Sequence, residues 1–166
     1  MKKISFIILV GISVSGCLDD QDECTKAVPE SELSVVDQTR LASDIITIDS
    51  YLAANSIIAT EEPNGVRYVI TKQGDGTTPC LESTISVTYT GKLYSGTVFD
   101  SSATPVSFPL ERLIVGWKLV LPLLQAGTKV TLYIPSGYGY GPQGGANGAI
   151  PSNANLIFDI ELLAVL

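Results

Sequence analysis

Three segments of the chain alternate apolar and polar side chains with a period of two, and one segment between them does not. The alternation runs through residues 85–90, 129–134 and 156–162. Because successive side chains of a strand point to opposite faces, this pattern predicts an antiparallel sheet with one buried and one wetter face. Residues 111–124 instead space their apolar side chains as a short helix does, and Pro122 limits that helix near its end. An antiparallel sheet with one short helix is therefore expected, and the glycine-rich residues 135–151 are expected to form a long, functional loop.

Composition and charge exclude several functions. The chain has no histidine and no Cys-x-x-Cys pair, which excludes Ser-His and Cys-His catalysis and the usual zinc and redox spacings. No metal or cofactor is expected. Residues 18–62 carry eleven acids and two bases, a net charge of −9, whereas residues 63–166 carry six of each. An acidic segment on a neutral domain argues against a nucleic-acid partner, because binding phosphates requires a basic face.

Five motifs follow one another across residues 63–166. The first runs from Val87 to Ser101 and carries Tyr89, Gly91, Gly96, Phe99 and Asp100; the others are residues 114–117, 138–141, 150–151 and 156–159. In this order and at nearly this spacing they resemble the FKBP family, prolyl isomerases that bind tacrolimus and rapamycin. The resemblance implies an α+β fold in which the antiparallel sheet wraps across one short helix.

The same resemblance implies a proline-binding pocket. Trp117 would form its floor, the Ile114 N–H and the Tyr140 hydroxyl would hold substrate carbonyls, and Asp100 would be a polar wall group. The expected catalytic residues are Tyr89, Phe99, Asp100, Trp117, Tyr140 and Phe158, and the expected substrate-binding residues are Phe108, Leu113, Ile114 and Ile150. Two alternatives stay open: aromatic residues at strand spacing also form ordinary cores, and Asp100 also suits bracing of nearby turns.

The pocket implied by this resemblance needs no nucleophile. Rotation of an X-Pro bond breaks amide resonance, and an apolar pocket that desolvates the amide favours the twisted state over the planar one. Proline-containing polypeptides are the expected partners. Tacrolimus-like macrolides are implied as further ligands, although Val106 and Ala149 are smaller than the residues common in the family, and Lys118-Leu119 replaces a frequent acidic pair.

The N-terminus predicts export. A basic start and an apolar run of about eleven residues end at Val14-Ser15-Gly16-Cys17. This resembles a bacterial lipobox, so residues 1–16 are interpreted as a lipoprotein signal peptide and Cys17 as the lipidated anchor to the outer membrane, on its periplasmic face or at the cell surface; an ordinary secretory signal is the alternative. Residues 17–33 read as an acidic tether, in which residues 18–23 are either a surface-export signal or a solvated spacer. In an oxidising compartment Cys24 and Cys80 form a disulfide or remain free thiols.

Residues 34–62 predict a helical extension before the domain at 63–166. Ser34 to Asp37 fits a capping box, and Leu41, Ile45, Ile48 and Leu52 place an apolar stripe on one face of a helix that ends near Asn55. This stripe either docks onto the chain's own domain or pairs with a second copy in a homodimer through residues 34–55. The leading functional hypothesis is a lipid-anchored prolyl isomerase that assists folding of exported proteins. A weakly catalytic or non-catalytic binding module and a purely structural surface lipoprotein are the alternatives.

Overall fold

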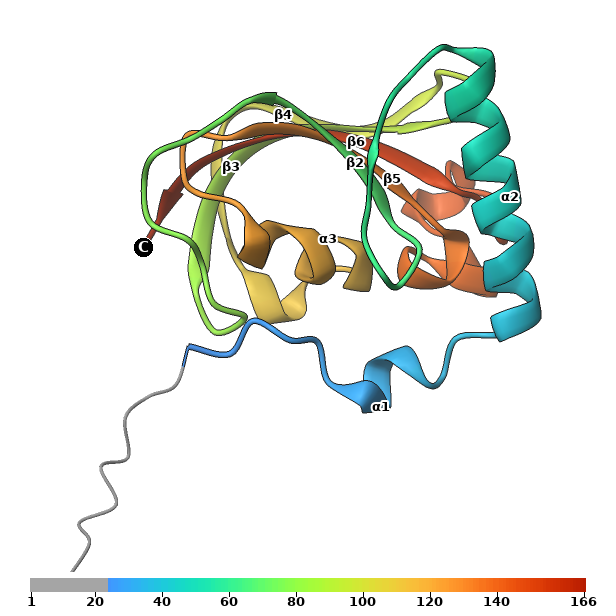
Figure 1. Cartoon of the computed structure of the whole chain (residues 1–166), viewed down its shortest axis with the longest axis horizontal. Helices are drawn as coiled ribbons and strands as arrows, with labels where there is room; N and C mark the ends of the chain where they lie inside the picture. The colour runs from blue at the N-terminus through green and yellow to red at the C-terminus, as the bar shows by residue number, and fades with distance from the viewer. Residues whose placement is uncertain (1–23) are drawn as a thin grey trace, which may run out of the picture.

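The computed structural model describes residues 24–166, in which a curved antiparallel sheet wraps across a short helix (Figure 1). The signal peptide and the lipidated Cys17 predicted above lie outside the described residues. The strand order is β1-β2-β5-β6-β3-β4, and every neighbouring pair is antiparallel. The strands are β1 (Thr60–Glu61), β2 (Arg67–Lys72), β3 (Thr84–Leu93), β4 (Val98–Pro109), β5 (Lys129–Ile134) and β6 (Leu156–Val165).

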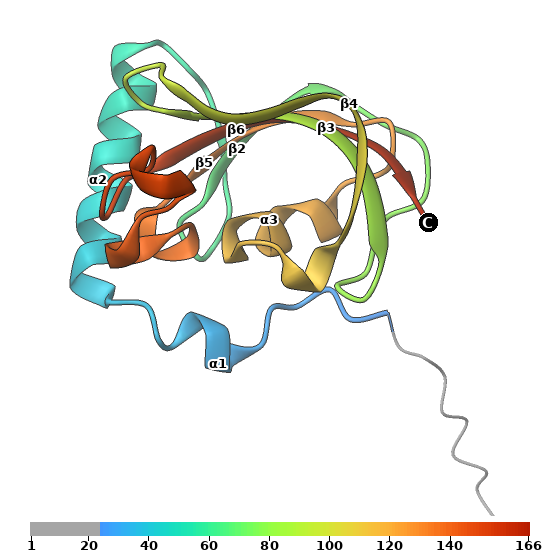
Figure 2. The same cartoon turned by 180° about the vertical axis from the view of Figure 1, so that it is seen from behind.

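In the described part of the chain, three α-helices accompany the sheet: α1 (Glu30–Leu33), α2 (Gln38–Ala54) and α3 (Val115–Val120). Helix α3 lies in the concavity of the sheet, α2 stands across one end of it, and α1 lies on the side of α3 away from the sheet (Figures 1 and 2). The segment predicted as one helix over 111–124 is α3 between two 3₁₀ turns, η1 (Leu110–Arg112) and η2 (Leu121–Leu123), and Pro122 lies in the second. Among the described residues, no helix is both long and apolar enough to cross a bilayer.

The main core lies between α3 and the concave face of the sheet. Val120 and Leu121 of the helical segment are fully buried, as are Leu132 of β5 and Leu156 and Leu162 of β6. These strand residues belong to the apolar half of the period-two pattern, so the predicted alternation is confirmed for this face.

The opposite face of the sheet is not uniformly wet. The alternation at residues 129–134 and 156–162 predicts Tyr133 and Ile157 on the wetter face, yet they are buried together with Ile48 and Leu52 of α2. The helix thus covers one end of the outer face. The apolar stripe that could have served a second copy is therefore used within the chain.

Helix α2 begins differently from the prediction. The capping box at Ser34 is not formed: the Asp37 carboxylate is the N-cap and accepts hydrogen bonds from the backbone N–H groups of Thr39 and Arg40, at 2.9 and 3.0 Å. Ser34 instead ends α1, where its N–H donates to Glu30 O. A short carboxylate that receives two orphan amides caps the first turn without help from Ser34. The predicted end near Asn55 is confirmed.

Residues 24–33, interpreted above as part of a tether, pack against the domain. Cys24 and Cys80 are joined by a disulfide, with their Cα atoms 5.1 Å apart. Val28 is buried in the main core, and Glu32 pairs with Lys118 of α3, which is itself buried. Within the described residues, the predicted tether is therefore in contact with the domain from Cys24 onward.

Strand β4 forms one edge of the sheet, and its pairing with β3 is interrupted twice. The register shifts between Val87 and Tyr89 and again between Gly91 and Lys92. At the first shift the partner of β3 jumps from Val106 to Ser102, so residues 103–105 bulge out of the ladder.

Candidate functional site

A cavity of about 200 Å³ opens between the N-terminal end of α3, the sheet and the loop that precedes β6. Eight of the ten predicted site residues line it: Tyr89, Asp100, Phe108, Leu113, Ile114, Trp117, Tyr140 and Phe158. The other two stand behind it. Phe99 packs its ring against Phe158, with centroids 5.5 Å apart, and Ile150 is buried in the loop, where it pairs with Gly145.

The base of the cavity is formed by Trp117 and Phe158, each 4 % exposed. Their rings meet edge to face, with centroids 5.3 Å apart and planes at 88°, and Tyr89 meets Trp117 in the same way at 5.6 Å. Such edge-to-face packing fixes the rings relative to one another. The cavity is therefore walled by a rigid aromatic cluster rather than by flexible side chains.

Two glycines make this packing sterically feasible. A Cβ at Gly91 would lie 2.6 Å from the Phe99 ring and 2.7 Å from the Phe158 ring. A Cβ at Gly116 would lie 2.5 Å from Cγ2 of Ile134, so its absence lets α3 approach β5. The glycine next to the tryptophan thus sets the depth at which the floor of the cavity sits.

Two phenols and one carboxylate supply the polar groups. The Tyr89 hydroxyl donates to Asp100 Oδ2 at 2.7 Å, and burial together with this hydrogen bond raises the pKa of Tyr89 to about 12. Burial, followed by the nearby charge of Asp100, also raises the pKa of Tyr140. Both phenols therefore remain protonated, and able to donate, well above neutral pH. Within the described part of the chain the Tyr140 hydroxyl has no hydrogen-bond acceptor, and the side chain is 38 % exposed.

Helix α3 presents a free amide at the same cavity. Ile114 is its N-cap, and the Ile114 carbonyl accepts a hydrogen bond from Trp117 N at 3.0 Å. The Ile114 N–H has no partner among residues 24–166. The rim therefore offers two donors, this amide and the Tyr140 hydroxyl, above an aromatic floor.

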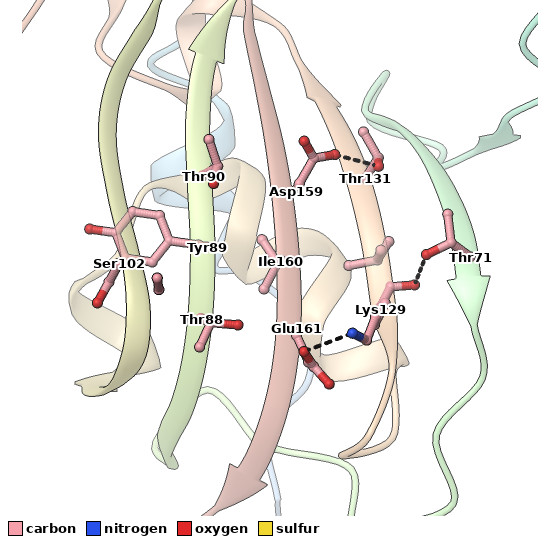
Figure 3. Close-up of a pocket in the computed structure, with 12 residues that line it drawn as sticks. Thr71, Thr88, Tyr89, Thr90, Ser102, Lys129, Thr131, Asp159, Ile160 and Glu161 are labelled. Atoms are coloured by element: carbon pink, nitrogen blue, oxygen red, sulfur yellow. Dashed lines mark hydrogen bonds and ion pairs between the residues drawn. The ribbon is translucent and has the colours of Figure 1, made fainter.

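A larger hollow, about 410 Å³, lies on the outer face of the sheet (Figure 3). Its charged groups are already paired: Glu161 with Lys129 at 3.0 Å, and Asp159 with Lys92 at 2.8 Å and with the Thr131 hydroxyl at 2.7 Å. Threonine side chains from three strands, Thr71, Thr88, Thr90 and Thr131, also line it. This hollow is shallow and mixes paired charges with small polar and apolar side chains, so the smaller aromatic cavity is the better candidate for a small-ligand site.

Sequence patterns did not identify the residues that hold the loop between β5 and β6. Asp44 of α2 is 1 % exposed and accepts hydrogen bonds from the backbone N–H and the hydroxyl of Ser136. A signal was available, because Asp44 lies three residues after Leu41 and four before Ile48, on the apolar stripe itself. A charged residue at a buried stripe position indicates a specific partner.

Comparison with known proteins agrees with this geometry. The profile of a family described as FKBP-type peptidyl-prolyl cis-trans isomerase matches residues 76–163. The chain is 35% identical over 157 residues to the FKBP-type peptidyl-prolyl cis-trans isomerase FkpA of Aeromonas hydrophila, covering 87% of this chain and 57% of that protein. It is 37% identical over 124 residues to the outer membrane protein MIP of Legionella longbeachae, covering 70% of this chain and 52% of that protein. The chain thus spans about half the length of these curated relatives.

A solved structure extends the comparison to the fold. The crystal structure of a peptidyl-prolyl cis-trans isomerase from Pseudomonas syringae pv. tomato superposes with a TM-score of 0.66 at 30% identity, covering 75% of this chain and 94% of that one. The curved sheet across α3, the aromatic cavity and the matches in sequence and structure lead to one conclusion: the chain belongs to the family of FKBP-type peptidyl-prolyl cis-trans isomerases.

Proposed function

We propose that this chain catalyses cis-trans isomerisation of X-Pro bonds in polypeptides, in the cavity floored by Trp117. The observation that carries the proposal is an aromatic cavity with two unpaired donors at its rim, Ile114 N–H and Tyr140 Oη–H. The proline ring would rest on Trp117, and the two donors would hold the carbonyls on either side of it. Family membership supports the same activity.

The rate enhancement would come from desolvation and differential binding. Twisting the amide localises the nitrogen lone pair and reduces the charge separation of the carbonyl, so an apolar cavity favours the twisted state over the planar one. Tyr89 and Asp100, held by their hydrogen bond, would form a fixed polar wall beside the reacting bond. Donors that are already oriented add stabilisation without reorganising during the reaction.

A protease-free assay on a proline peptide tests this proposal through Tyr140→Phe and Trp117→Leu. Tyr140→Phe removes one hydroxyl from an exposed side chain, and a hydrogen bond worth roughly 0.5 to 1.5 kcal/mol corresponds to a loss of about two- to twelve-fold in kcat/KM with little change in Tm. Trp117→Leu should lower both kcat/KM and Tm, because it also reduces a buried volume.

Two results would reject the assignment. If the wild-type chain accelerates isomerisation and neither substitution slows it, the aromatic cluster is core and the site lies elsewhere. If the wild-type chain binds proline peptides in this cavity without accelerating isomerisation, the chain is a binding module rather than an enzyme.

The proposal extends to location and ligands. We infer attachment to the outer membrane through a lipidated Cys17 and a role in folding exported proteins; the name of the Legionella relative supports an envelope location. Cys17→Ala should release the chain from membranes, and retention of the substituted chain would reject lipidation. Tacrolimus-like macrolides would compete for the same cavity. A homodimer through residues 34–55 would rest on the exposed Val35 and Ile46, since the apolar stripe of α2 is buried.

A further inference from the structure

Helix α2 lies directly beside the loop that carries Tyr140, as both overall views show (Figures 1 and 2). The loop leaves β5 at Pro135, contains the 3₁₀ turn η3 (Ser136–Tyr138), and returns to β6 at Asn155. Ser136 and Asn153, near its two ends, are hydrogen-bonded to the same turn of α2. This arrangement connects the N-terminal extension to the rim of the cavity.

Asp44 holds the first end of the loop. Its Oδ2 accepts hydrogen bonds from Ser136 N, at 2.9 Å, and from the Ser136 hydroxyl. Ser136 is fully buried, and its N–H is also 2.9 Å from Oδ1 of Asn155, where the loop returns. Close packing adds to these contacts, because a Cβ on Gly137 would lie 2.5 Å from Cγ1 of Val36.

Arg40 holds the other end of the loop, next to β6. Its Nη2 donates to the carbonyl of Asn153 at 2.8 Å, and its Nε lies 2.8 Å from Asp44 Oδ1. The Nε–H vector does not meet hydrogen-bond geometry toward that carboxylate, so this second contact acts as a charge pair. One turn of α2 therefore binds both ends of the loop through two neighbouring side chains, Arg40 and Asp44.

Backbone hydrogen bonds connect Ser136 and Asn153 to the residues on either side of Tyr140. Gly139 N donates to Ser136 O at 3.0 Å, which closes η3 immediately before Tyr140. Asn153 N donates to Gly141 O at 2.8 Å, immediately after Tyr140. Displacing Ser136 or Asn153 therefore displaces the residues that flank the Tyr140 Cα.

Burying the Asp44 carboxylate on the apolar stripe of α2 costs free energy unless specific partners compensate for the lost water. An apolar residue at this position would extend the stripe, and buried ion pairs contribute little net stability compared with well-packed apolar groups. What the two side chains do provide is a fixed position for the loop, since Asp44 Oδ2 accepts two hydrogen bonds from Ser136 and Arg40 Nη2 donates to the carbonyl of Asn153.

We propose that Asp44 and Arg40 are positioning residues for the isomerase site, which hold the Tyr140 hydroxyl at the rim of the cavity by fixing both ends of its loop. The inference rests on the proposed function for its kinetic consequence. The extension helix is thereby assigned a part in catalysis that requires no contact with substrate.

The test compares Asp44→Asn with a matched control on the same helix. Asp49 is the control, because its carboxylate pairs with Arg67 of β2 at 3.0 Å and does not touch the loop. Asp44→Asn should lower kcat/KM by about 3- to 10-fold, mostly through kcat, whereas Asp49→Ala should change it by less than about 2-fold. Arg40→Met, at a side chain that is 42 % exposed, provides a second variant that leaves the buried Asp44 in place.

A double-mutant cycle separates positioning from a general loss of structure. In the Tyr140→Phe background, Asp44→Asn should have almost no further effect on kcat/KM, because the hydroxyl that it positions is already gone. Full additivity of the two substitutions, or an unchanged kcat/KM in both Asp44→Asn and Arg40→Met, would overturn the proposal.

Hydrogen exchange gives a readout that does not depend on turnover. Amides of residues 136–141 should exchange at least about 10-fold faster in Asp44→Asn than in wild type, with no such change in Asp49→Ala. If wild type proves inactive, the proposed function fails, and this exchange comparison alone then decides whether Asp44 holds the loop. Unchanged exchange at 136–141 would overturn the inference.

Discussion

Removing the Cys24–Cys80 disulfide should cost the protein much of its stability without touching the cavity. The bond closes a loop with a sequence separation of 56 residues, which contains α1, α2, β1 and β2. The chain-entropy relation for a loop of this size gives an entropy of about 14 cal/mol/K, or about 4 kcal/mol at 25 °C. For a chain of this length, that free energy corresponds to a fall in Tm of roughly 10 °C.

The perturbation is Cys24→Ser together with Cys80→Ser, followed by thermal and urea unfolding. Because the effect acts mainly on the unfolded chain, the urea m-value should increase, since the unlinked chain exposes more surface. Wild type measured in reductant should unfold at the same temperature as the double variant, which controls for the serines themselves. None of the cavity-lining residues lies on the segment from Cys24 to Cys80, so kcat/KM at 25 °C should stay within about 2-fold of wild type.

Two outcomes would refute this reasoning. If the double variant melts within about 1 °C of oxidised wild type, the loop is already closed in the unfolded chain, or the bond does not form in solution. If kcat/KM falls sharply while the protein remains folded, the strap of residues 24–33 acts on the cavity, through Lys118 of α3, rather than on the unfolded state.

Three further predictions concern single side chains. Gly116→Ala should lower the free energy of unfolding by about 1 to 3 kcal/mol and should also lower kcat/KM, because the new Cβ would lie 2.5 Å from Ile134 and push the Trp117 floor outward. Gly96→Ala is the comparison: its Cβ would meet nothing within 4 Å, although its φ of 88° adds backbone strain. An unchanged activity in Gly116→Ala would contradict the role given to this glycine. Tyr94→Phe should leave the free energy of unfolding unchanged or raise it by up to about 1 kcal/mol, because the buried Tyr94 hydroxyl has no hydrogen-bond partner among the described residues. A clear fall in the free energy of unfolding, measured with urea, would show that this hydroxyl is hydrogen-bonded in solution. Burial raises the pKa of Tyr89 from the ordinary 10.0 of an unfolded tyrosine to about 12, so the folded state binds the phenol proton more tightly. Its contribution to stability is complete below about pH 10 and is lost as pH rises toward 12, so Tyr89→Phe should flatten the decline of Tm above about pH 10. An equally steep decline in the variant would exclude Tyr89 as its source.

Local patterns predicted the concave half of the structure. The alternation at residues 156–162 marks Leu156 and Leu162 as buried because one sheet face packs on a single helix, and that relation needs only a period of two. Most of the predicted cavity residues were named through the FKBP resemblance, which carries the long-range arrangement that periodicity alone lacks. Phe99 and Ile150 were assigned to the site by the same resemblance, but they support the cavity from behind.

The parts that escaped prediction depend on contacts between segments far apart in the chain. Tyr133 looked like an outward residue of β5, and only the docking of α2 buries it. The sequence marks Lys118 only as one of two residues that replace a frequent acidic pair, yet α1 brings Glu32 against it from 86 residues away. Asp44 Oδ2 accepts hydrogen bonds from Ser136, 92 residues downstream. A single sequence does not show which distant residue a buried charged side chain will contact.

The broken pairing of β4 has a consequence for a protein that is expected to meet unfolded chains. A long, regular edge strand offers a row of free N–H and C=O groups on which another strand can add, and this is a common start of aggregation. On β4, Pro105 lies in the bulge of residues 103–105 and Pro109 ends the strand, so two positions lack an N–H. The register of the ladder also shifts between Ser102 and Val106. The opposite edge, β1, is only two residues long. Extended polypeptides therefore meet no long, regular ladder at the β4 margin, which favours contact with side chains there rather than with the backbone of the strand.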